Sequence, residues 1–341
     1  MIDEGVGIQR LRLSRSWLSP QLLALIGIMV SVGFGYLAVR RVDWNDTWAA
    51  FRSTDYWWLV PALGLMATAF FIRVWRWQMM FLPPRPPFLP LARALYVGYL
   101  LNNLLPARAG EAARVLSLNR RIQVPVSKAT ATILVERAYD VLSLVVLLFV
   151  ISPWLPHVSW LRAAGIVALG LTVALLVSAL LIRRSDGRVL EALFRPLQRL
   201  SFLPRESVER ASQDFHDGLA GLLRMRVAVA TFGLTLVSWL VLGLGFWLVT
   251  LAFHLHVSYL AGLLVVIGIG LAMILPSSPA ALGVFEGATV VCLSAYGIGD
   301  SEALSYALVL HALNFLPFVV LAPFVFRASL GRRGRPSSAP A

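Results

Sequence analysis

Blocks of about twenty apolar residues recur along this chain and constrain its fold more than any other feature. A helix of about 20 apolar residues crosses a hydrocarbon core of roughly 30 Å. Only 14% of the 341 residues are charged, against roughly 25% in soluble domains. The sequence therefore predicts an all-α polytopic membrane protein. Its blocks lie at about 21–39, 57–80, 129–151, 160–182, 227–251 and 302–326, which gives about six spanning helices.

Two further apolar stretches, at about 88–118 and 257–297, are broken in the middle. The first contains "LLPARAGEAAR" and the second "ILPSSPAALGVFEGA". Each has Leu-Pro, a short run of small or polar residues, a glycine and then a glutamate. The matching residues are Pro106 and Pro276, Gly110 and Gly283, and Glu111 and Glu286. The sequence thus predicts an internal repeat, with repeat 1 at about 57–151 and repeat 2 at about 227–326.

The distribution of basic residues predicts the topology. If each broken stretch enters the membrane and returns to the same side, 23 of the 30 Lys and Arg residues fall on one side, which is predicted to be cytoplasmic. Both termini are then cytoplasmic. Two full crossings instead would place the nine basic residues of 183–226 outside. Three full spans separate the breaks, so the repeats are inverted, the first break opening from the cytoplasm and the second from outside. The basic segments are 1–20, 73–93, 119–128, 183–226 and 327–341.

The predicted domain organisation follows from these segments. Residues 1–20 form a cytoplasmic N-terminus, 21–326 the membrane domain, and 327–341 a disordered basic tail. The first span has no small-residue cleavage site and is predicted to be an uncleaved anchor. Apolar residues recur at helical spacing in 183–226, which predicts two amphipathic helices at the membrane surface. This segment is either a connector between the repeats or a site for lipid or partner binding.

Inverted repeats with interrupted helices near the midplane are typical of secondary transporters. Proline and glycine end a helix and leave free N–H groups at the start of the next one, where the helix dipole favours an anion. Non-helical backbone survives at membrane depth only where protein or a watery cavity covers it. The alternative is a pair of proline-kinked helices that bind no ligand.

Charged residues within these apolar segments are costly unless they are paired or face a cavity, so they are candidate functional residues. An arginine fork suits phosphate. The acids could instead only neutralise arginines, and Glu111 and Glu286 could either cap the following helices or be protonated when an anionic headgroup binds. The predicted substrate-binding residues are Asn102, Asn103, Pro106, Arg108, Gly110, Glu111, Arg114, Glu136, Arg137 and Asp140 in repeat 1, and Pro276, Ser277, Ser278, Gly283, Glu286, His311 and Asn314 in repeat 2.

Three runs carry a resemblance to a known family: "LLNNLLPARAGEAARV", "ATATILVERAYDVLSLVVLL" and "PSSPAALGVFEGA". They resemble the flippase-like membrane domain of lysylphosphatidylglycerol synthases and its stand-alone relatives, which are associated with polyprenyl-glycolipid or hopanoid pathways. The resemblance covers about 20–326 and implies transbilayer movement of an anionic or amphipathic lipid. The aminoacyl-transferase domain of those synthases is missing, so synthesis of aminoacylated lipid is not expected. Relatives often have a glycine-rich second loop, where this chain has "SSPAAL".

The sequence therefore predicts translocation of an anionic lipid, such as an aminoacylated phospholipid or a polyprenyl-phosphate-linked lipid, in a bacterial cytoplasmic (inner) membrane. Expected partners are membrane lipids and, as a candidate, a lipid-modifying enzyme. The alternatives are a secondary transporter of a soluble anion or ion, and a noncatalytic membrane subunit of a lipid- or glycan-modifying complex.

Several classes are not expected. A P-loop is absent, which argues against an ATP-driven pump, and an enzyme would need an acid or metal cluster that the sequence does not show. The chain has one cysteine, Cys292, which is too few for a cysteine-based metal site. No acid or cysteine lies near the pair His254 and His256, so no metal site or cofactor is expected there. The net charge of +13 fits basic cytoplasmic loops, and no nucleic-acid partner is expected.

Overall fold

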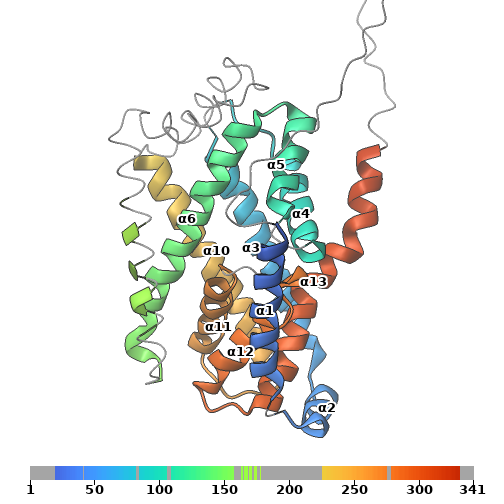
Figure 1. Cartoon of the computed structure of the whole chain (residues 1–341), viewed down its shortest axis with the longest axis vertical. Coiled ribbons are helices and arrows are strands. Elements are labelled where there is room, and N and C mark those ends of the chain that lie inside the picture. The colour runs from blue at the N-terminus through green and yellow to red at the C-terminus, as the bar shows by residue number, and fades with distance from the viewer. Residues whose placement is uncertain are drawn as a thin grey trace, which may run out of the picture.

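The computed structural model describes residues 20–40, 42–81, 84–105, 109–156, 225–274 and 278–330, with scattered positions between 163 and 177. All regular structure in these residues is helical, and the protein is an all-α polytopic membrane protein (Figure 1). The predicted span 160–182 and the predicted amphipathic segment 183–226 lie almost entirely outside the described residues. Only the last two residues of that segment are described, and they belong to a long helix that follows.

The first half of the chain forms a long entry helix, a short surface helix, a spanning helix, a broken pair and a second spanning helix. Pro87 and Pro125 stand directly before two of these helices, and extended backbone at Leu105 ends the helix that begins after Pro87. The elements are α1 (Pro20–Val39), α2 (Trp44–Arg52), η1 (Tyr56–Trp58), α3 (Leu59–Met79), α4 (Phe88–Leu104), α5 (Ala109–Ile122), α6 (Val126–Ile151) and η2 (Ser152–Trp154).

The second half repeats the order of a spanning helix, a broken pair and a long final helix. The elements are α10 (Met225–Ala252), α11 (Tyr259–Ala272), η3 (Pro279–Ala281), α12 (Val284–Ser294) and α13 (Asp300–Leu330). Both predicted breaks are therefore real interruptions between helices. The predicted tail 327–341 is wrong in its first residues, because α13 continues to Leu330.

Three of the described helical stretches are long and apolar enough to cross a membrane, namely Tyr56–Met79, Met225–Ala252 and Asp300–Val325. Helix α6 has 26 residues and is also long enough, but it carries Glu136, Arg137 and Asp140 near its middle. A charge at the centre of a spanning helix costs about 2.5 to 3.5 kcal/mol in insertion experiments. Helix α6 therefore depends on partners from other helices.

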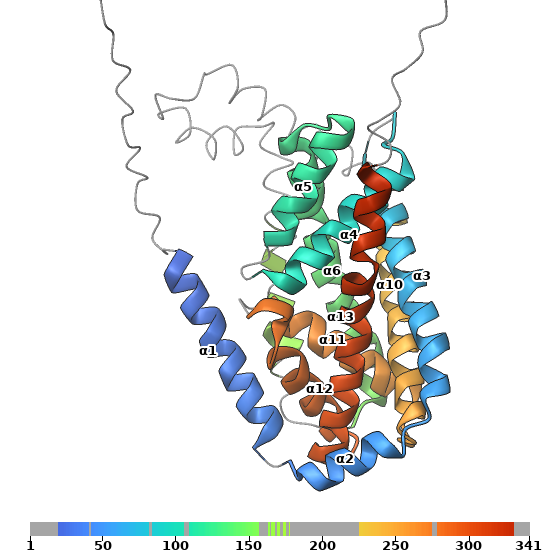
Figure 2. The same ribbon diagram turned by 90° about the vertical axis from the view of Figure 1, so that its right-hand side faces the viewer.

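The two broken pairs enter the molecule from opposite ends (Figure 2). Helix α4 runs from the upper end toward the middle, and α5 returns to the upper end. Helices α11 and α12 form the same kind of hairpin from the lower end. Helix α1 begins, and α13 ends, toward the upper side. The opposite directions of the two hairpins are the arrangement that the inverted repeat predicts.

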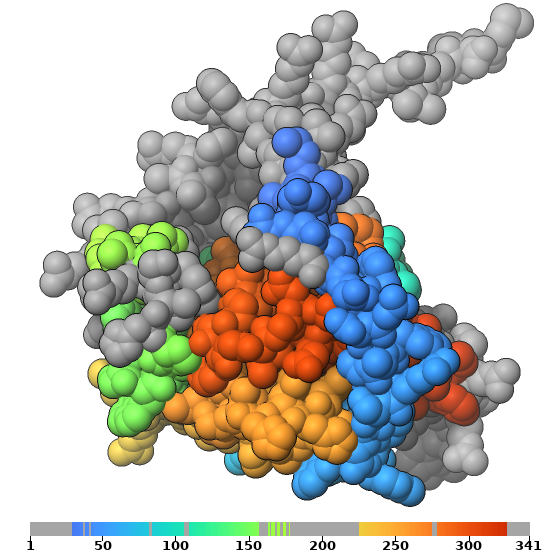
Figure 3. All heavy atoms as spheres, turned by 90° about the horizontal axis from the view of Figure 1, so that it is seen from below, coloured from blue at the N-terminus to red at the C-terminus, as the bar shows by residue number. Residues whose placement is uncertain are grey.

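Helices α3 and α10, which precede the two hairpins, pack side by side in opposite directions (Figure 1). Their axes come close where Gly245 faces the carbonyl of Ala62. The larger apolar core gathers residues of the second half of α6, of α10, α11 and α12, and of the start of α13. A smaller core joins α3, α4, α5 and the first half of α6. Seen from below, residues at the start of α13 fill the middle of the lower end, between the α2 region and α6 (Figure 3).

Helix α2 lies in a segment for which the sequence predicted no helix. Asp43 caps it by accepting hydrogen bonds from the N–H groups of Asn45 and Asp46. The Asp43 N–H donates to Ser301 Oγ at 2.9 Å, which ties the start of α2 to the start of α13. Trp44 and Trp48 are exposed on it. An amphipathic helix with exposed tryptophans at the end of a membrane domain is typical of the membrane–water interface.

Candidate functional site

The first break is held by a close approach of α4 and α5. A Cβ at Gly110 would collide with the carbonyl oxygen of Gly98, so only glycine permits this distance between the helices. Asn102 Oδ1 accepts a hydrogen bond from the Gly110 N–H at 2.9 Å. One of the N–H groups that the sequence assigned to an anion is therefore already satisfied by a side chain of the protein.

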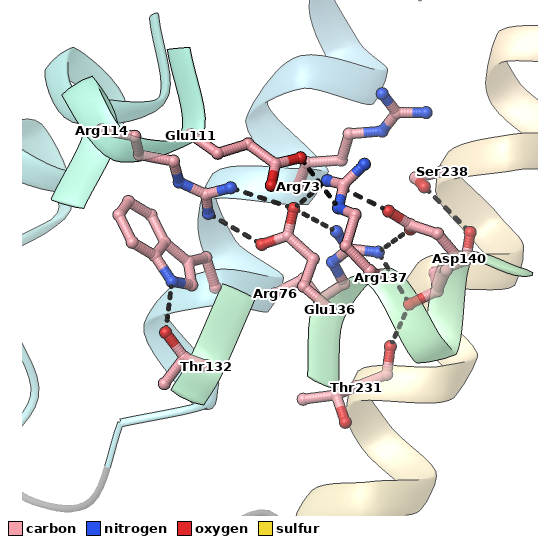
Figure 4. A network of polar contacts seen from close by, with 12 residues as sticks. Arg73, Arg76, Glu111, Arg114, Thr132, Glu136, Arg137, Asp140, Thr231 and Ser238 are labelled. Atoms are coloured by element: carbon pink, nitrogen blue, oxygen red, sulfur yellow. Dashed lines mark hydrogen bonds and ion pairs between the residues drawn. The ribbon is translucent and has the colours of Figure 1, made fainter. Parts of the chain in front are cut away.

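Glu136 of α6 is the centre of a buried charge network (Figure 4). Arg114 of α5 donates to it twice, from Nη1 to Oε1 at 3.0 Å and from Nη2 to Oε2 at 2.7 Å. Arg76 Nη2 of α3 lies 3.1 Å from Oε1, and Arg137 Nη2 donates to the same oxygen at 2.8 Å. One carboxylate thus holds three guanidinium groups, from three helices, inside the membrane domain.

Asp140 continues the network one turn along α6, on the face that Glu136 also occupies. Arg76 Nη1 donates to Asp140 Oδ1 at 2.6 Å, and Arg137 Nη2 lies 3.3 Å from Oδ2. Arg76 Nη1 also donates to Thr235 Oγ1 of α10 at 3.0 Å. The network therefore connects repeat 1 to the first helix of repeat 2.

The guanidinium of Arg114 stacks on an aromatic ring as well. Its Cζ lies 3.5 Å from the centre of the Trp77 ring, and Trp77 Nε1 donates to Thr132 Oγ1 at 3.0 Å. A cation over the face of tryptophan is stabilised most when it is removed from water. Arg114 therefore stacks on Trp77 with its face and binds Glu136 with its edge, and these contacts hold it in place as a structural part of the network.

Exposure divides the network into a buried part and an open edge. The side chains of Arg76 and Glu136 are each 1% exposed, whereas those of Arg137 and Glu111 are 36% and 31% exposed. Arg137 Nε lies 3.7 Å from Glu111 Oε1, too far for a hydrogen bond. Among the described ion pairs of the network, the Arg137–Glu111 pair is therefore the exposed edge, at which a ligand can bind without breaking a buried pair.

The second break places its own acid against the following helix. Glu286 Oε2 accepts from the Gly283 N–H at 2.7 Å, and His311 Nδ1 lies 2.6 Å from Glu286 Oε1. The ring of Phe285 stacks on that of His311 at a centroid distance of 4.5 Å. Glu286 therefore caps α12 and at the same time pairs with α13.

Helix α1 closes over this second break. Gly283 has φ +82°, and a Cβ there would collide with the Ser31 carbonyl. The Ser278 N–H donates to Ser31 Oγ at 2.8 Å. Within the break, Ala280 has φ 56° and Ala281 φ 54°, a left-handed conformation that disfavours residues other than glycine. The strained loop is thus supported by a helix from outside its own repeat.

The structure brings together only part of the predicted site. Glu111, Arg114, Glu136, Arg137 and Asp140 form one network, and Glu286 and His311 form a separate pair. Asn314 donates to the Leu310 carbonyl of its own helix, and Asn103 is half-buried in the last turn of α4. Pro106, Arg108, Pro276 and Ser277 lie outside the described residues.

Sequence reasoning counted Arg73 and Arg76 only as basic residues of the cytoplasmic side, at the end of the span 57–80, and did not include them in the predicted site. Both lie on α3, and Arg76 is fully buried in the charge network. The signal was their spacing: two arginines at i and i+3 near the end of an apolar block share one helix face, which suits a buried partner better than a loop. Within the described residues, no group of three His, Cys, Asp or Glu side chains is placed to hold a metal ion.

Comparisons with known proteins agree with the predicted family. The family model for the lysylphosphatidylglycerol synthase TM region matches residues 24–322. A UPF0104 membrane protein of Methanocaldococcus jannaschii is 21% identical over 233 residues, which cover 66% of this chain and 92% of that protein. Glycosyltransferase AglD of Haloferax volcanii is 27% identical over 263 residues, which cover 66% of this chain but only 41% of that protein.

Proposed function

Since the chain belongs to the lysylphosphatidylglycerol synthase TM region family, we propose that it moves an anionic lipid across the membrane. The headgroup binds at the open edge formed by Arg137 and Glu111. The observation that carries the proposal is the exposure of Arg137. It is a permanently charged side chain, anchored by Glu136 and Asp140, that still presents a third of its surface inside a membrane domain.

The charge balance of the network supports an anionic ligand. Arg76, Arg114 and Arg137 pair with the three carboxylates of Glu111, Glu136 and Asp140. Arg73, one turn before Arg76 on α3, adds a fourth positive charge that no carboxylate among the described residues pairs with. Such a charge is costly in hydrocarbon and is offset when an anionic headgroup enters.

Apolar surface beside the first break supports a lipid over a small soluble anion. Leu104 and Leu105 are 50% and 43% exposed at the end of α4, and Glu111 lies in the first turn of the helix that follows the break. An amphiphile can keep its chains against these leucines while its headgroup reaches Arg137. The two hairpins enter from opposite ends of the molecule, as in secondary transporters with inverted repeats. This arrangement supports alternating access, in which the headgroup site opens first to one side of the membrane and then to the other.

Proteoliposomes containing a fluorescent phosphatidylglycerol, with dithionite added outside, test the proposal. The intact protein is expected to make the inner-leaflet probe accessible to dithionite. Arg137→Ala should abolish this activity, and Arg137→Lys should restore only part of it because lysine lacks the bidentate fork. Arg52→Ala, an exposed arginine on α2, is the matched control and should keep full activity. Equal rates in empty liposomes and proteoliposomes would refute the proposal.

A second function is favoured by one observation. The match to glycosyltransferase AglD covers less than half of that protein, so a domain like this one can be joined to an enzyme of glycan transfer. The chain would then be a noncatalytic membrane subunit that presents a lipid-linked substrate. Lipid binding without translocation in the same proteoliposomes would favour this alternative.

A further inference from the structure

Arg73 lies one helical turn before Arg76 on α3 but has a different environment. Among the described residues no carboxylate pairs with it, in contrast to Arg76, Arg114 and Arg137. Its Nη1 donates to the Tyr99 hydroxyl at 3.2 Å, and its Cζ lies 4.5 Å from the centre of the Trp239 ring. Two aromatic residues, from α4 and α10, thus fix the guanidinium in place.

The remaining donors of this group are buried without partners. Arg73 Nε and Nη2 have no hydrogen-bond acceptor, and neither does Trp239 Nε1 beside them. Nε and Nη2 form one edge of the planar guanidinium, the edge that donates two parallel hydrogen bonds to a phosphate or carboxylate. A buried donor without a partner requires an explanation, such as a bound ion or water.

We propose that Arg73 and Trp239 form a second subsite, which binds the phosphate-type oxyanion of the transported headgroup between steps of translocation. The inference rests on the proposed function and assigns a residue outside the Arg137–Glu111 edge. The guanidinium edge and the indole N–H supply three donors to one tetrahedral anion, a number that such an anion accommodates readily.

The surroundings favour an oxyanion attached to an apolar molecule. Phe70, Tyr99 and Phe318 form an aromatic cluster next to Arg73, with ring centroids 5.5 to 6.0 Å apart. Arg73 itself is on the border of the network, whereas Arg76 is enclosed. Because Arg73 belongs to no ion pair among the described residues, an oxyanion bound there breaks none of the buried pairs.

Binding by the purified full-length protein tests this subsite directly. The protein is equilibrated with equimolar phosphatidylglycerol and diacylglycerol, and retained lipid is measured by native mass spectrometry. The intact protein should retain phosphatidylglycerol selectively. Arg73→Gln should weaken that retention by about tenfold or more. Trp239→Phe, which replaces the indole with an aromatic ring that has no N–H donor, should weaken it by about fivefold. Arg52→Gln is the control, because Arg52 also stacks on a tryptophan, Trp48, but far from the network.

A second arm identifies the source of the oxyanion. Stabilisation of the intact protein by inorganic phosphate over chloride, absent in Arg73→Gln, would show that the oxyanion alone suffices. Loss of phosphatidylglycerol retention without a phosphate effect would assign the subsite to the lipid headgroup. Either result supports the subsite. Unchanged retention in both Arg73→Gln and Trp239→Phe would overturn it, and Trp239→Phe alone decides the question if Arg73→Gln does not fold.

Failure of this inference is distinguishable from failure of the proposed function. Arg73-dependent binding without translocation would leave the subsite in place and remove the flippase proposal. The opposite result is translocation by the intact protein together with unchanged lipid binding and translocation in Arg73→Gln and Trp239→Phe. It would support the flippase proposal and rule out the Arg73 subsite.

Discussion

His311 of α13 pairs with Glu286 of α12 through an Nδ1 to Oε1 contact of 2.6 Å. This pair occupies in repeat 2 the place that Arg137 and Glu111 occupy in repeat 1. In both repeats the acid stands in the first turn after the break and the basic group lies near the middle of the following helix. The two repeats therefore share the order of their helices and also an equivalent contact between an acidic and a basic side chain.

The two pairs differ in a way that bears on mechanism. Arg137 is permanently charged and touches two further acids, whereas the partner of Glu286 is an imidazole that contacts no second acid among the described residues. Repeat 1 thus pairs its acid with a guanidinium and repeat 2 pairs its acid with an imidazole. We infer that anion binding is concentrated in repeat 1.

Arg114 and Arg137 should respond differently to alanine. Arg114→Ala removes two hydrogen bonds from the buried carboxylate of Glu136 and a stacking contact from Trp77, so it should lower the free energy of unfolding by about 3 kcal/mol. Arg137→Ala acts at the exposed edge and should cost on the order of 1 kcal/mol while abolishing lipid translocation. Thermal unfolding in detergent, together with the dithionite assay, measures both effects. Equal destabilisation by the two variants would contradict the division into a buried part and an open edge.

Single-cysteine labelling should verify the topology. The native Cys292 is 2% exposed, so it contributes little background. Asn45→Cys and Asp300→Cys, which lie at the same end of the molecule, should react with a membrane-impermeant maleimide added outside. Cysteines at 85, 205 and 335 should react only after the cytoplasmic side is opened. External labelling at 205 would rule out the re-entrant arrangement.

Relief of backbone strain in the second break should be measurable. Ala280 and Ala281 both have positive φ, and the left-handed conformation costs an L-residue roughly 1–2 kcal/mol. Ala280→Gly should therefore stabilise the protein by about 0.5–1 kcal/mol after the larger entropy of the unfolded glycine is included. The control Ala288→Gly, within α12, should destabilise by about 1 kcal/mol. A lower unfolding temperature for Ala280→Gly would show that the strain is compensated locally.

The two breaks could be predicted from sequence because their causes are local. Proline and glycine end helices wherever they occur, and a repeated Leu-Pro, Gly, Glu pattern identified both hairpins with their acids. The charges on α6 were equally recognisable, since they interrupt an apolar span.

Contacts between side chains that are far apart in the sequence could not be predicted from it. Arg76 reads as a loop arginine when basic residues are counted, and its burial depends on Asp140, which lies 64 positions later. Asn102 was assigned to substrate, but its amide oxygen satisfies Gly110 across the hairpin. Helix α2 was missed because nine residues are too few for a span and its apolar positions are sparse.

Glu286 and His311 should control the pH response of transport. Two hypotheses remain for Glu286, a simple cap of α12 or an acid whose protonation accompanies binding of an anionic headgroup. Glu286→Gln separates them, because glutamine still accepts from the Gly283 N–H but carries no charge opposite His311. We expect this variant to fold with a loss on the order of 1 kcal/mol. If protonation of Glu286 accompanies headgroup binding, the variant should also flatten the pH profile of translocation over an assay range of about pH 5.5 to 8.5.

His311→Gln should flatten the same profile, since it removes the other member of the pair. Glu111→Gln is the matched variant in repeat 1, where the partner is the permanently charged Arg137, and it should leave the shape of the profile unchanged while lowering the rate. Dithionite assays of the three variants across this pH range are the measurement. Profiles of Glu286→Gln and His311→Gln parallel to that of the intact protein would leave Glu286 as a helix cap and His311 as a packing partner of Phe285.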